Sequence, residues 1–419
     1  MRSLVRRWLS MTPVLALAAV GVAGCADQTS DDDDASHANI TSVDHSSVKR
    51  QSIGNCWIYA TTSWLEALHR AATNADVDVS ESYLTYWHWF DHITNGDATD
   101  HVDTGGGYLM AADIIGRYGL MNEGDFLADE ANAEMSERQK AALDAIDASL
   151  KSGVLADRQL RKNREVVRKE LDRAWNLDAA VVARMDAVFG ASVERTLDSS
   201  FDAFAASAEN RIIHPMDFDA RLKDPATGTF VVKPLAEALG MGMGGAPLAW
   251  HVVEYPGAVG ERRAFWKRVQ RALHDQMPVM TSWKLDFNAL RRDSVVSMSE
   301  LARRGPGVQG GHMTVMHDYQ AEVPGVGLLR AGEQATSAQM EAALADGTKI
   351  EFVRVKNSWG GLRPDRWDVG ALPGYHDLEL AYLDGPIKEC ALDANGNSDP
   401  TRCSRETTPL IDVVLPAGY

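Results

Sequence analysis

The feature that most constrains the fold is a change in hydrophobic periodicity near residue 246. Before this point, most apolar residues recur at helical spacing, about every three to four positions. After it, several short segments alternate between apolar and polar residues, as strands with one buried face do. A helical half followed by a strand-rich half predicts an α+β fold. We expect helices at 56–72, 80–92, 108–118 and 265–274, and strands at 278–283, 312–319 and 349–355.

Residues 131–245, called the middle segment below, are predicted to form a helical insertion. Leu143, Ile146 and Leu150 make one amphipathic stripe, and a second runs from Leu160 to Ala174. The pattern therefore divides the chain into consecutive parts. These are a signal peptide (1–24), a disordered tether (25–47), a helical lobe (48–130), the middle segment (131–245), a β-rich lobe (246–390) and a C-terminal tail (391–419).

The first residues have the pattern of an export signal rather than of a folded element. Arginines precede an apolar run, Trp8–Val22, that is short for a membrane span, and Val22-Ala23-Gly24-Cys25 closes it. This ending resembles the bacterial lipobox, in which the cysteine receives the lipid. We expect an exported protein anchored to a bacterial membrane through Cys25, facing the periplasm or the cell surface. The alternative is an ordinary cleaved signal with a chance cysteine.

The formal net charge of -17 limits the partners of the chain. Acidic proteins repel nucleic acid and anionic lipid, so we expect no nucleic-acid partner and membrane contact only through the N-terminal lipid. We expect no metal and no cofactor. Cys390 and Cys403 flank a loop near the C-terminus and are a disulfide candidate in an exported protein, the alternative being two free thiols.

Three separated segments carry residues suited to acyl transfer. Cys56 begins a predicted helix, where the helix dipole and free N–H groups favour a thiolate. Gln51 lies upstream and could donate to an oxyanion beside the Cys56 N–H. His312 begins a predicted strand and Asn357 ends another. Each residue alone has an ordinary structural explanation, but together they supply an oxyanion donor, a nucleophile, a base and a group that orients the base.

These segments resemble the papain-like cysteine peptidases, and most closely their bleomycin hydrolase and bacterial aminopeptidase C branch. The matching residues are Gln51, Gly54-Asn55-Cys56-Trp57, Ser80-Glu81-Ser82-Tyr83-Leu84, Gly105-Gly106-Gly107-Tyr108, His312, Tyr319 and Lys356-Asn357-Ser358-Trp359-Gly360. The resemblance covers about 48–125 and 262–385, and it implies a two-lobed fold with Cys56 in the helical lobe and His312 and Asn357 in the β-rich lobe.

The resemblance also implies a role for each residue. Cys56 would attack the scissile carbonyl, paired with His312 as thiolate and imidazolium, and Asn357 would hold the imidazole while Trp359 shields their hydrogen bond. Gly106 and Gly107 would bind the substrate backbone. The spacing from Gln51 to Cys56 is one residue shorter than in the family, which leaves the oxyanion role of Gln51 open.

The expected function is therefore a cysteine peptidase that acts on peptides or proteins. Two alternatives remain from the sequence. One is a papain-fold binding module that has lost catalysis, and the other is cysteine-dependent acyl transfer, such as transamidation. A rival base, His317, is disfavoured because alternation places it on the strand face opposite His312.

Overall fold

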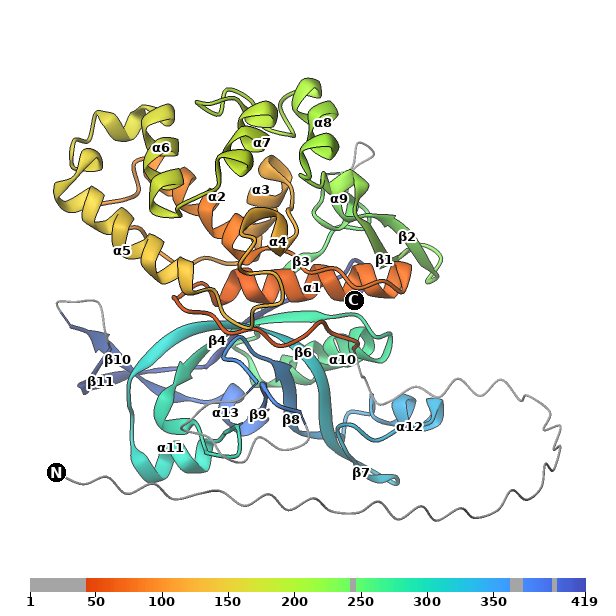
Figure 1. Ribbon diagram of the computed structural model, residues 1–419. Helices are drawn as coiled ribbons and strands as arrows, with labels where there is room; N and C mark the ends of the chain where they lie inside the picture. The colour runs from red at the N-terminus through yellow and green to blue at the C-terminus, as the bar shows by residue number, and fades with distance from the viewer. Residues whose placement is uncertain (1–42, 242–245, 362–371, 394–397) are drawn as a thin grey trace, which may run out of the picture. The chain divides into compact units, whose positions relative to one another are not determined.

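The computed structural model describes residues 43–241, 246–361, 372–393 and 398–419. The predicted signal peptide, Cys25 and the tether as far as residue 42 lie outside this part of the chain. The first helices of the described chain gather in one lobe (Figure 1). They are α1 (Cys56–Thr73), α2 (Glu81–Thr94), α3 (Tyr108–Tyr118), α4 (Glu123–Phe126), α5 (Glu137–Ser152), α6 (Arg164–Ala174), α7 (Ala179–Phe189) and α8 (Phe201–Ser207).

The second lobe is built on a sheet. Its elements and those leading to it are β1 (Asp219–Lys223), β2 (Phe230–Pro234), α9 (Leu235–Ala238), β3 (His251–Glu254), α10 (Val259–His274), β4 (Val279–Asp286), β5 (Val295–Val296), α11 (Met298–Arg304), β6 (Gln309–Val323), β7 (Gly327–Leu329), α12 (Ser337–Ala342), β8 (Lys349–Lys356), β9 (Tyr375–Glu379), α13 (Leu380–Asp384), β10 (Ile387–Leu392), β11 (Ser398–Thr407) and β12 (Leu410–Leu415). Short 3-10 turns lie at Val154–Ala156, Leu160–Lys162, Ala208–Asn210, Pro215–Asp217 and Phe287–Ala289.

Within the described residues, the main sheet has the strand order β3-β12-β4-β6-β8-β9-β5, and β7 pairs with β6. The long strand β6 lies antiparallel between β4 and β8, so its residues occupy the middle of the sheet. Helix α1 packs against β6 and lies along the boundary between the lobes (Figure 1). The structure thus confirms the α+β fold with a helical lobe and a β-rich lobe.

Local sequence signals explain where several helices begin. Ser80 and Ser136 cap α2 and α5 by accepting the backbone N–H groups of Tyr83 and Gln139. Helix α1 begins differently, because its N-cap residue Asn55 makes no capping hydrogen bond with its side chain. That side chain is buried instead, so the start of α1 is fixed by contacts distant in sequence.

Three expectations need correction. The segment 391–419 is not a tail, because β12 lies between β3 and β4, where its backbone groups complete the ladder. The tether ends earlier than residue 47, because Val43 is buried and its N–H donates to the His317 carbonyl. The middle segment is not wholly helical either, since β1 and β2 form an antiparallel hairpin that packs on α1.

Cys390 and Cys403, at paired positions of strands β10 and β11, form a disulfide. The loop residues 394–397 between these strands lie outside the described residues. The bridge holds together a two-stranded ribbon separate from the main sheet.

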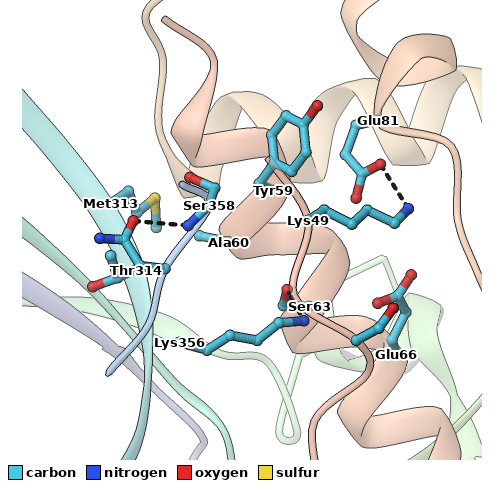
Figure 2. A pocket seen from close by; sticks show the side chains of 12 residues that line it. Lys49, Tyr59, Ala60, Ser63, Glu66, Glu81, Met313, Thr314, Lys356 and Ser358 are labelled. Carbon is cyan, nitrogen blue, oxygen red and sulfur yellow. Dashed lines mark hydrogen bonds and ion pairs between the residues drawn. The ribbon is translucent and has the colours of Figure 1, made fainter. Parts of the chain in front are cut away.

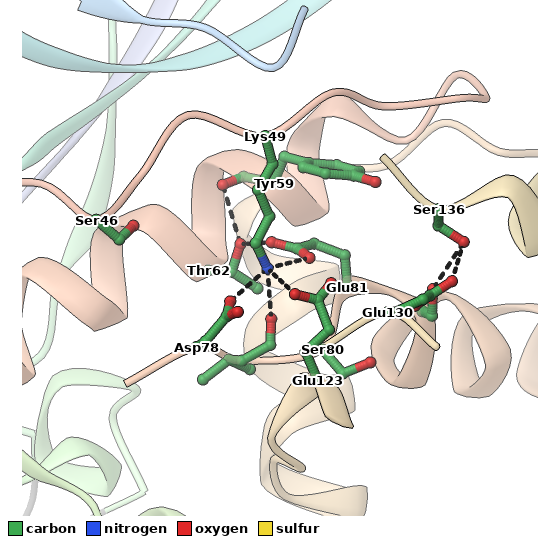
Figure 3. Close-up of polar contacts among 12 residues, drawn as sticks. Ser46, Lys49, Tyr59, Thr62, Asp78, Ser80, Glu81, Glu123, Glu130 and Ser136 are labelled. Atoms are coloured by element: carbon green, nitrogen blue, oxygen red, sulfur yellow. Dashed lines mark hydrogen bonds and ion pairs between the residues drawn. The ribbon is translucent and has the colours of Figure 1, made fainter. Parts of the chain in front are cut away.

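A buried cluster of charges joins the N-terminal stretch to the helical lobe (Figure 3). The Lys49 ammonium lies 2.6 Å from Asp78, 2.8 Å from Glu81 and 2.9 Å from Glu123. Burial alone would lower the pKa of Lys49, but the surrounding carboxylates, Glu81 foremost, outweigh it and raise that pKa. Burial also raises the pKa of the Glu123 carboxyl to about 9. Lys49 therefore holds together an excess of acidic groups.

A second buried cation lies beside a cavity of about 10 Å³ between α1 and the sheet (Figure 2). The Lys356 amine donates to Ser63 of α1 and to Ser46 of the N-terminal stretch. Burial lowers the pKa of Lys356 to about 8, although the nearby Glu66 carboxylate opposes this. Since Lys356 immediately precedes Asn357, this contact ties the end of β8 to the helix that begins at Cys56.

We expect Lys49→Met to destabilise the protein by about 3–5 kcal/mol, because it leaves buried carboxylates without their cation. Equilibrium urea unfolding at pH 7 measures this. Lys140→Met is the matched control, because it removes an exposed ion pair with Asp144 and should change stability by less than about 1 kcal/mol. A Lys49→Met protein as stable as the control variant would contradict the role assigned to the cluster.

Candidate active site

Cys56 lies at the first position of α1, where it is 9% exposed. Burial raises the pKa of its thiol above the ordinary value. Backbone hydrogen bonds from Met313 and Trp57 oppose this effect in part. The Met313 contact places the thiol against strand β6, at the residue next to His312.

His312, on strand β6, is held by Asn357, which directly follows the neighbouring strand β8. The ring nitrogen Nε2 and the Asn357 oxygen Oδ1 are 2.8 Å apart, and the Ser358 N–H also donates to Oδ1 at 2.7 Å. Because an amide oxygen only accepts, Nε2 must carry the proton and donate it to Asn357. The neutral ring therefore keeps Nδ1 as the nitrogen able to accept a proton.

Aromatic rings enclose this histidine. Trp359 stacks on it with ring centroids 4.8 Å apart and an interplanar angle of 18°, and Trp283 of the neighbouring strand β4 contacts it edge-on at 5.4 Å. Burial lowers the pKa of His312 to about 4, while the hydrogen bond to Asn357 raises it slightly against that trend. The enclosure keeps water from the hydrogen bond between His312 and Asn357.

The pKa of Cys56 is raised and that of His312 is lowered, and these two shifts decide the protonation state of the pair before substrate binds. A thiol with a raised pKa and an imidazole with a lowered pKa are both neutral near pH 7. The helix dipole at the N-terminus of α1 favours a thiolate. Burial, the first cause of the raised pKa of Cys56, favours the neutral thiol. A thiolate with an imidazolium would form only by proton transfer from Cys56 to His312.

Gln51 is fixed between two of the predicted segments. Its backbone N–H donates to the Ser358 carbonyl at 2.9 Å, and its side-chain oxygen accepts the Ser358 hydroxyl at 2.5 Å. The side-chain nitrogen Nε2 donates to the Ile53 carbonyl at 2.7 Å, inside the shortened loop before Cys56. This orientation occupies one of the two N–H groups that an oxyanion hole would use, so the oxyanion role of Gln51 stays a prediction.

Gly106 lies beside the ring of Trp57, the residue after Cys56, whereas a Cβ atom on Gly107 would meet no atom within 4 Å. A Cβ atom on Gly106 would lie 2.5 Å from that ring, which excludes any side chain there. The Trp57 indole N–H donates to the Thr104 carbonyl at 2.9 Å and so holds the loop that carries both glycines. The backbone of Gly106 is exposed, as a backbone that binds a substrate must be.

Two features of the site gave no signal in the sequence. His376 of β9 is buried, accepts the Asn357 side-chain N–H at 3.3 Å and contacts Trp359 edge-on at 5.0 Å. The side chain of Asn55 donates to Gln139 of the middle segment. Periodicity reveals neither contact, because each joins residues from different elements. The rival base His317 contacts the Val43 carbonyl and the ring of Tyr375, away from the group around His312.

In the described part of the chain, no cluster of three or more histidine, cysteine, aspartate or glutamate residues is arranged to hold a metal ion. No helix within the same residues is long and apolar enough to cross a membrane.

The sequence matches no family model, and a search of curated proteins returns no match. Among solved structures, the chain is similar to PepW from Lactobacillus rhamnosis HN001, with a TM-score of 0.39 and 13% identity over 90% of this chain and 81% of PepW. It is also similar to xylellain, a cysteine protease from Xylella fastidiosa, with a TM-score of 0.34 and 9% identity over 90% of this chain and 85% of xylellain. At such values the assignment of the site rests on the contacts within this chain.

The neutral resting pair predicts how Cys56 reacts with iodoacetamide. Because only the thiolate reacts, and burial raises the pKa of the thiol, the alkylation rate should rise steadily from pH 6 to pH 9. Mass spectrometry of the modified peptide measures the rate, and urea-unfolded protein provides the reference for an exposed thiol. A rate plateau between pH 4 and pH 6 would instead reveal an ion pair at rest and contradict the lowered pKa of His312.

Proposed function

We propose that the protein is a cysteine peptidase of the papain type that hydrolyses peptide bonds through a thioester on Cys56. The observation that carries the proposal is the hydrogen bond from His312 to Asn357. His312 lies on strand β6, and the next residue of that strand, Met313, contacts the Cys56 thiol. That arrangement combines a nucleophile, a base with a free ring nitrogen and a group that fixes the base.

In the proposed mechanism, His312 Nδ1 takes the Cys56 proton as the sulfur attacks the substrate carbonyl. The backbone N–H of Cys56, at the start of α1, donates to the oxyanion that develops. His312 then gives its proton to the leaving amine, and the acyl group stays on sulfur. A water molecule, deprotonated by His312, attacks the thioester. The C–S bond then breaks, the acid leaves, and His312 returns the proton to the Cys56 sulfur. Asn357 keeps Nε2 protonated throughout, so only Nδ1 exchanges protons with the reactants.

Acyl transfer to an amine is a second enzymatic outcome of the same thioester. Product analysis with and without added glycinamide separates it from hydrolysis, because a transferase forms the amide product. The engagement of Gln51 Nε2 with the Ile53 carbonyl favours a third candidate, a binding module without turnover. That candidate predicts no cleavage in any peptide library.

We expect Cys56→Ala and His312→Gln to abolish cleavage of a peptide library, because they remove the nucleophile and the base. A loss of at least about 10³-fold is expected from removing a member of such a catalytic group. Mass spectrometry of the library identifies cleaved peptides, and circular dichroism verifies folding.

The control for the base is His317→Gln, which removes the rival histidine and should retain cleavage. Loss of activity in His317→Gln with normal activity in His312→Gln would reverse the assignment. Equal turnover by wild type and Cys56→Ala would refute the peptidase proposal.

We also propose that the protein is exported and anchored to a membrane by a lipid on Cys25. The support is the order of arginines, apolar run and small residues before Cys25. In a bacterial host, Cys25→Ser should move the protein from the membrane fraction to the soluble fraction and stop incorporation of labelled palmitate. Retention of label in Cys25→Ser would rule out lipidation at this cysteine.

A further inference from the structure

The middle segment begins with residues that contact both parts of the candidate active site. The first contact is with the β-rich lobe. The side-chain carboxylate of Glu134 accepts the Gly361 N–H at 2.6 Å. The backbone carbonyl of Glu134 accepts the Arg50 N–H at 2.6 Å. The backbone of Arg50 in turn forms an isolated β-bridge with Trp359, whose ring stacks on His312. The chain entering the middle segment is thus fixed at the turn that carries Trp359.

The second contact, five residues later, is with the start of α1. The side-chain nitrogen of Asn55 donates to Gln139 at 3.1 Å and to Thr85 at 2.9 Å. Asn55, Thr85 and Gln139 are each at most 1% exposed. Buried hydrogen bonds of this kind are costly to break, because the groups left unpaired have no water to replace the partner. Asn55 is consequently held in one orientation.

Gln139 is itself held on several sides. Its backbone N–H is capped by Ser136 at the start of α5, and its side-chain nitrogen donates to Tyr59 at 3.2 Å and to Ser82 at 3.1 Å. Tyr59 belongs to α1 and Ser82 to α2. The side chain of Gln139 therefore links three helices at the point where α1 begins.

The orientation of Asn55 matters because its peptide bond to Cys56 carries the N–H that would bind the oxyanion. The ordinary N-cap contact, from the Asn55 side chain to a backbone N–H of α1, is absent. Gln51, the other donor expected from the sequence, has one N–H committed to Ile53. The Cys56 N–H is thus the remaining expected donor beside the nucleophile, and the residue that precedes it, Asn55, is held by Gln139.

We propose that Gln139 is a positioning residue of the active site, which holds the Asn55–Cys56 peptide so that its N–H faces the developing oxyanion. This rests on the proposed function, since it assigns Gln139 a part in acyl transfer. It also gives the middle segment a role in positioning the active site, because residues 134–139 connect helix α1 with the turn that carries Trp359.

The test compares two reactions of Cys56 that differ in the oxyanion. Acylation by p-nitrophenyl acetate forms the S–C bond, breaks the ester C–O bond and releases p-nitrophenolate while His312 takes the thiol proton, and it passes through an oxyanion. Alkylation by iodoacetamide displaces iodide at a saturated carbon and forms none. In Gln139→Met, the single-turnover acylation rate should fall about tenfold, because loss of an oxyanion donor costs about 10²–10³-fold and misdirection costs part of that. The alkylation rate should stay within about twofold.

Two further variants make the outcome specific. Gln139→Glu keeps an acceptor for Asn55, and the hydroxyls of Tyr59 and Ser82 can donate to it, so acylation should recover to within about threefold of wild type. Arg138→Met changes the neighbouring residue, whose side chain contacts Asp129 and the carbonyls of Trp175 and Asn176 rather than Asn55, and should leave both rates unchanged.

The results separate the two proposals. Equal losses of acylation and alkylation in Gln139→Met would show a merely structural role, and unchanged acylation would exclude any role; either overturns the positioning proposal. A wild-type protein that is alkylated at Cys56 but never acylated would overturn the proposed function instead.

Discussion

The packing of helix α1 against strand β6 is the constraint on which the rest of the structure depends. It places the Cys56 thiol under the Met313 backbone and removes the surrounding polar groups from water. Charged groups buried at such a boundary persist only when they are paired and hydrogen-bonded. The ammonium of Lys49 among its carboxylates and the amine of Lys356 between two serines meet this requirement. The same boundary therefore supplies both the attachment of the lobes and the placement of the candidate nucleophile.

The elements that the sequence predicts well are those whose signal is local. The expected helix 56–72 is observed as Cys56–Thr73, the helix 108–118 as Tyr108–Tyr118 and the strand 349–355 as Lys349–Lys356. In each, the apolar face repeats over the length of the element, so neighbours in sequence suffice to define it. Cys56 and Asn357 could be placed for a related reason, because Cys56 begins α1 and Asn357 directly follows β8, whereas Gln51 lies in the loop before α1 and His312 is the fourth residue of β6.

The rest depends on contacts between distant residues, which leave no periodicity. Strand β12 lies in the interior of the sheet because its backbone completes the ladder between β3 and β4, yet its sequence at the end of the chain suggested a tail. Residues 43–47 are polar in composition, and only the partners supplied by β6 explain why Val43 and His45 are buried. The contact between Asn55 and Gln139 spans 84 positions, so no window of sequence contains both.

Burial of the candidate pair also changes which effect must drive the chemistry. The sequence favoured an ionised thiol at the helix N-terminus, but burial raises the pKa of Cys56 and lowers that of His312, so the charge has to be created during the reaction. A site that develops charge in a low-dielectric environment gains most from donors fixed in advance, because such donors need no reorganisation as the charge forms. With the thiol neutral at rest and the amide of Gln51 partly committed to Ile53, the proposed catalysis depends on the direction of the Cys56 N–H. The residues that hold Asn55 would therefore help to set the rate, together with the cost of ionising the buried thiol.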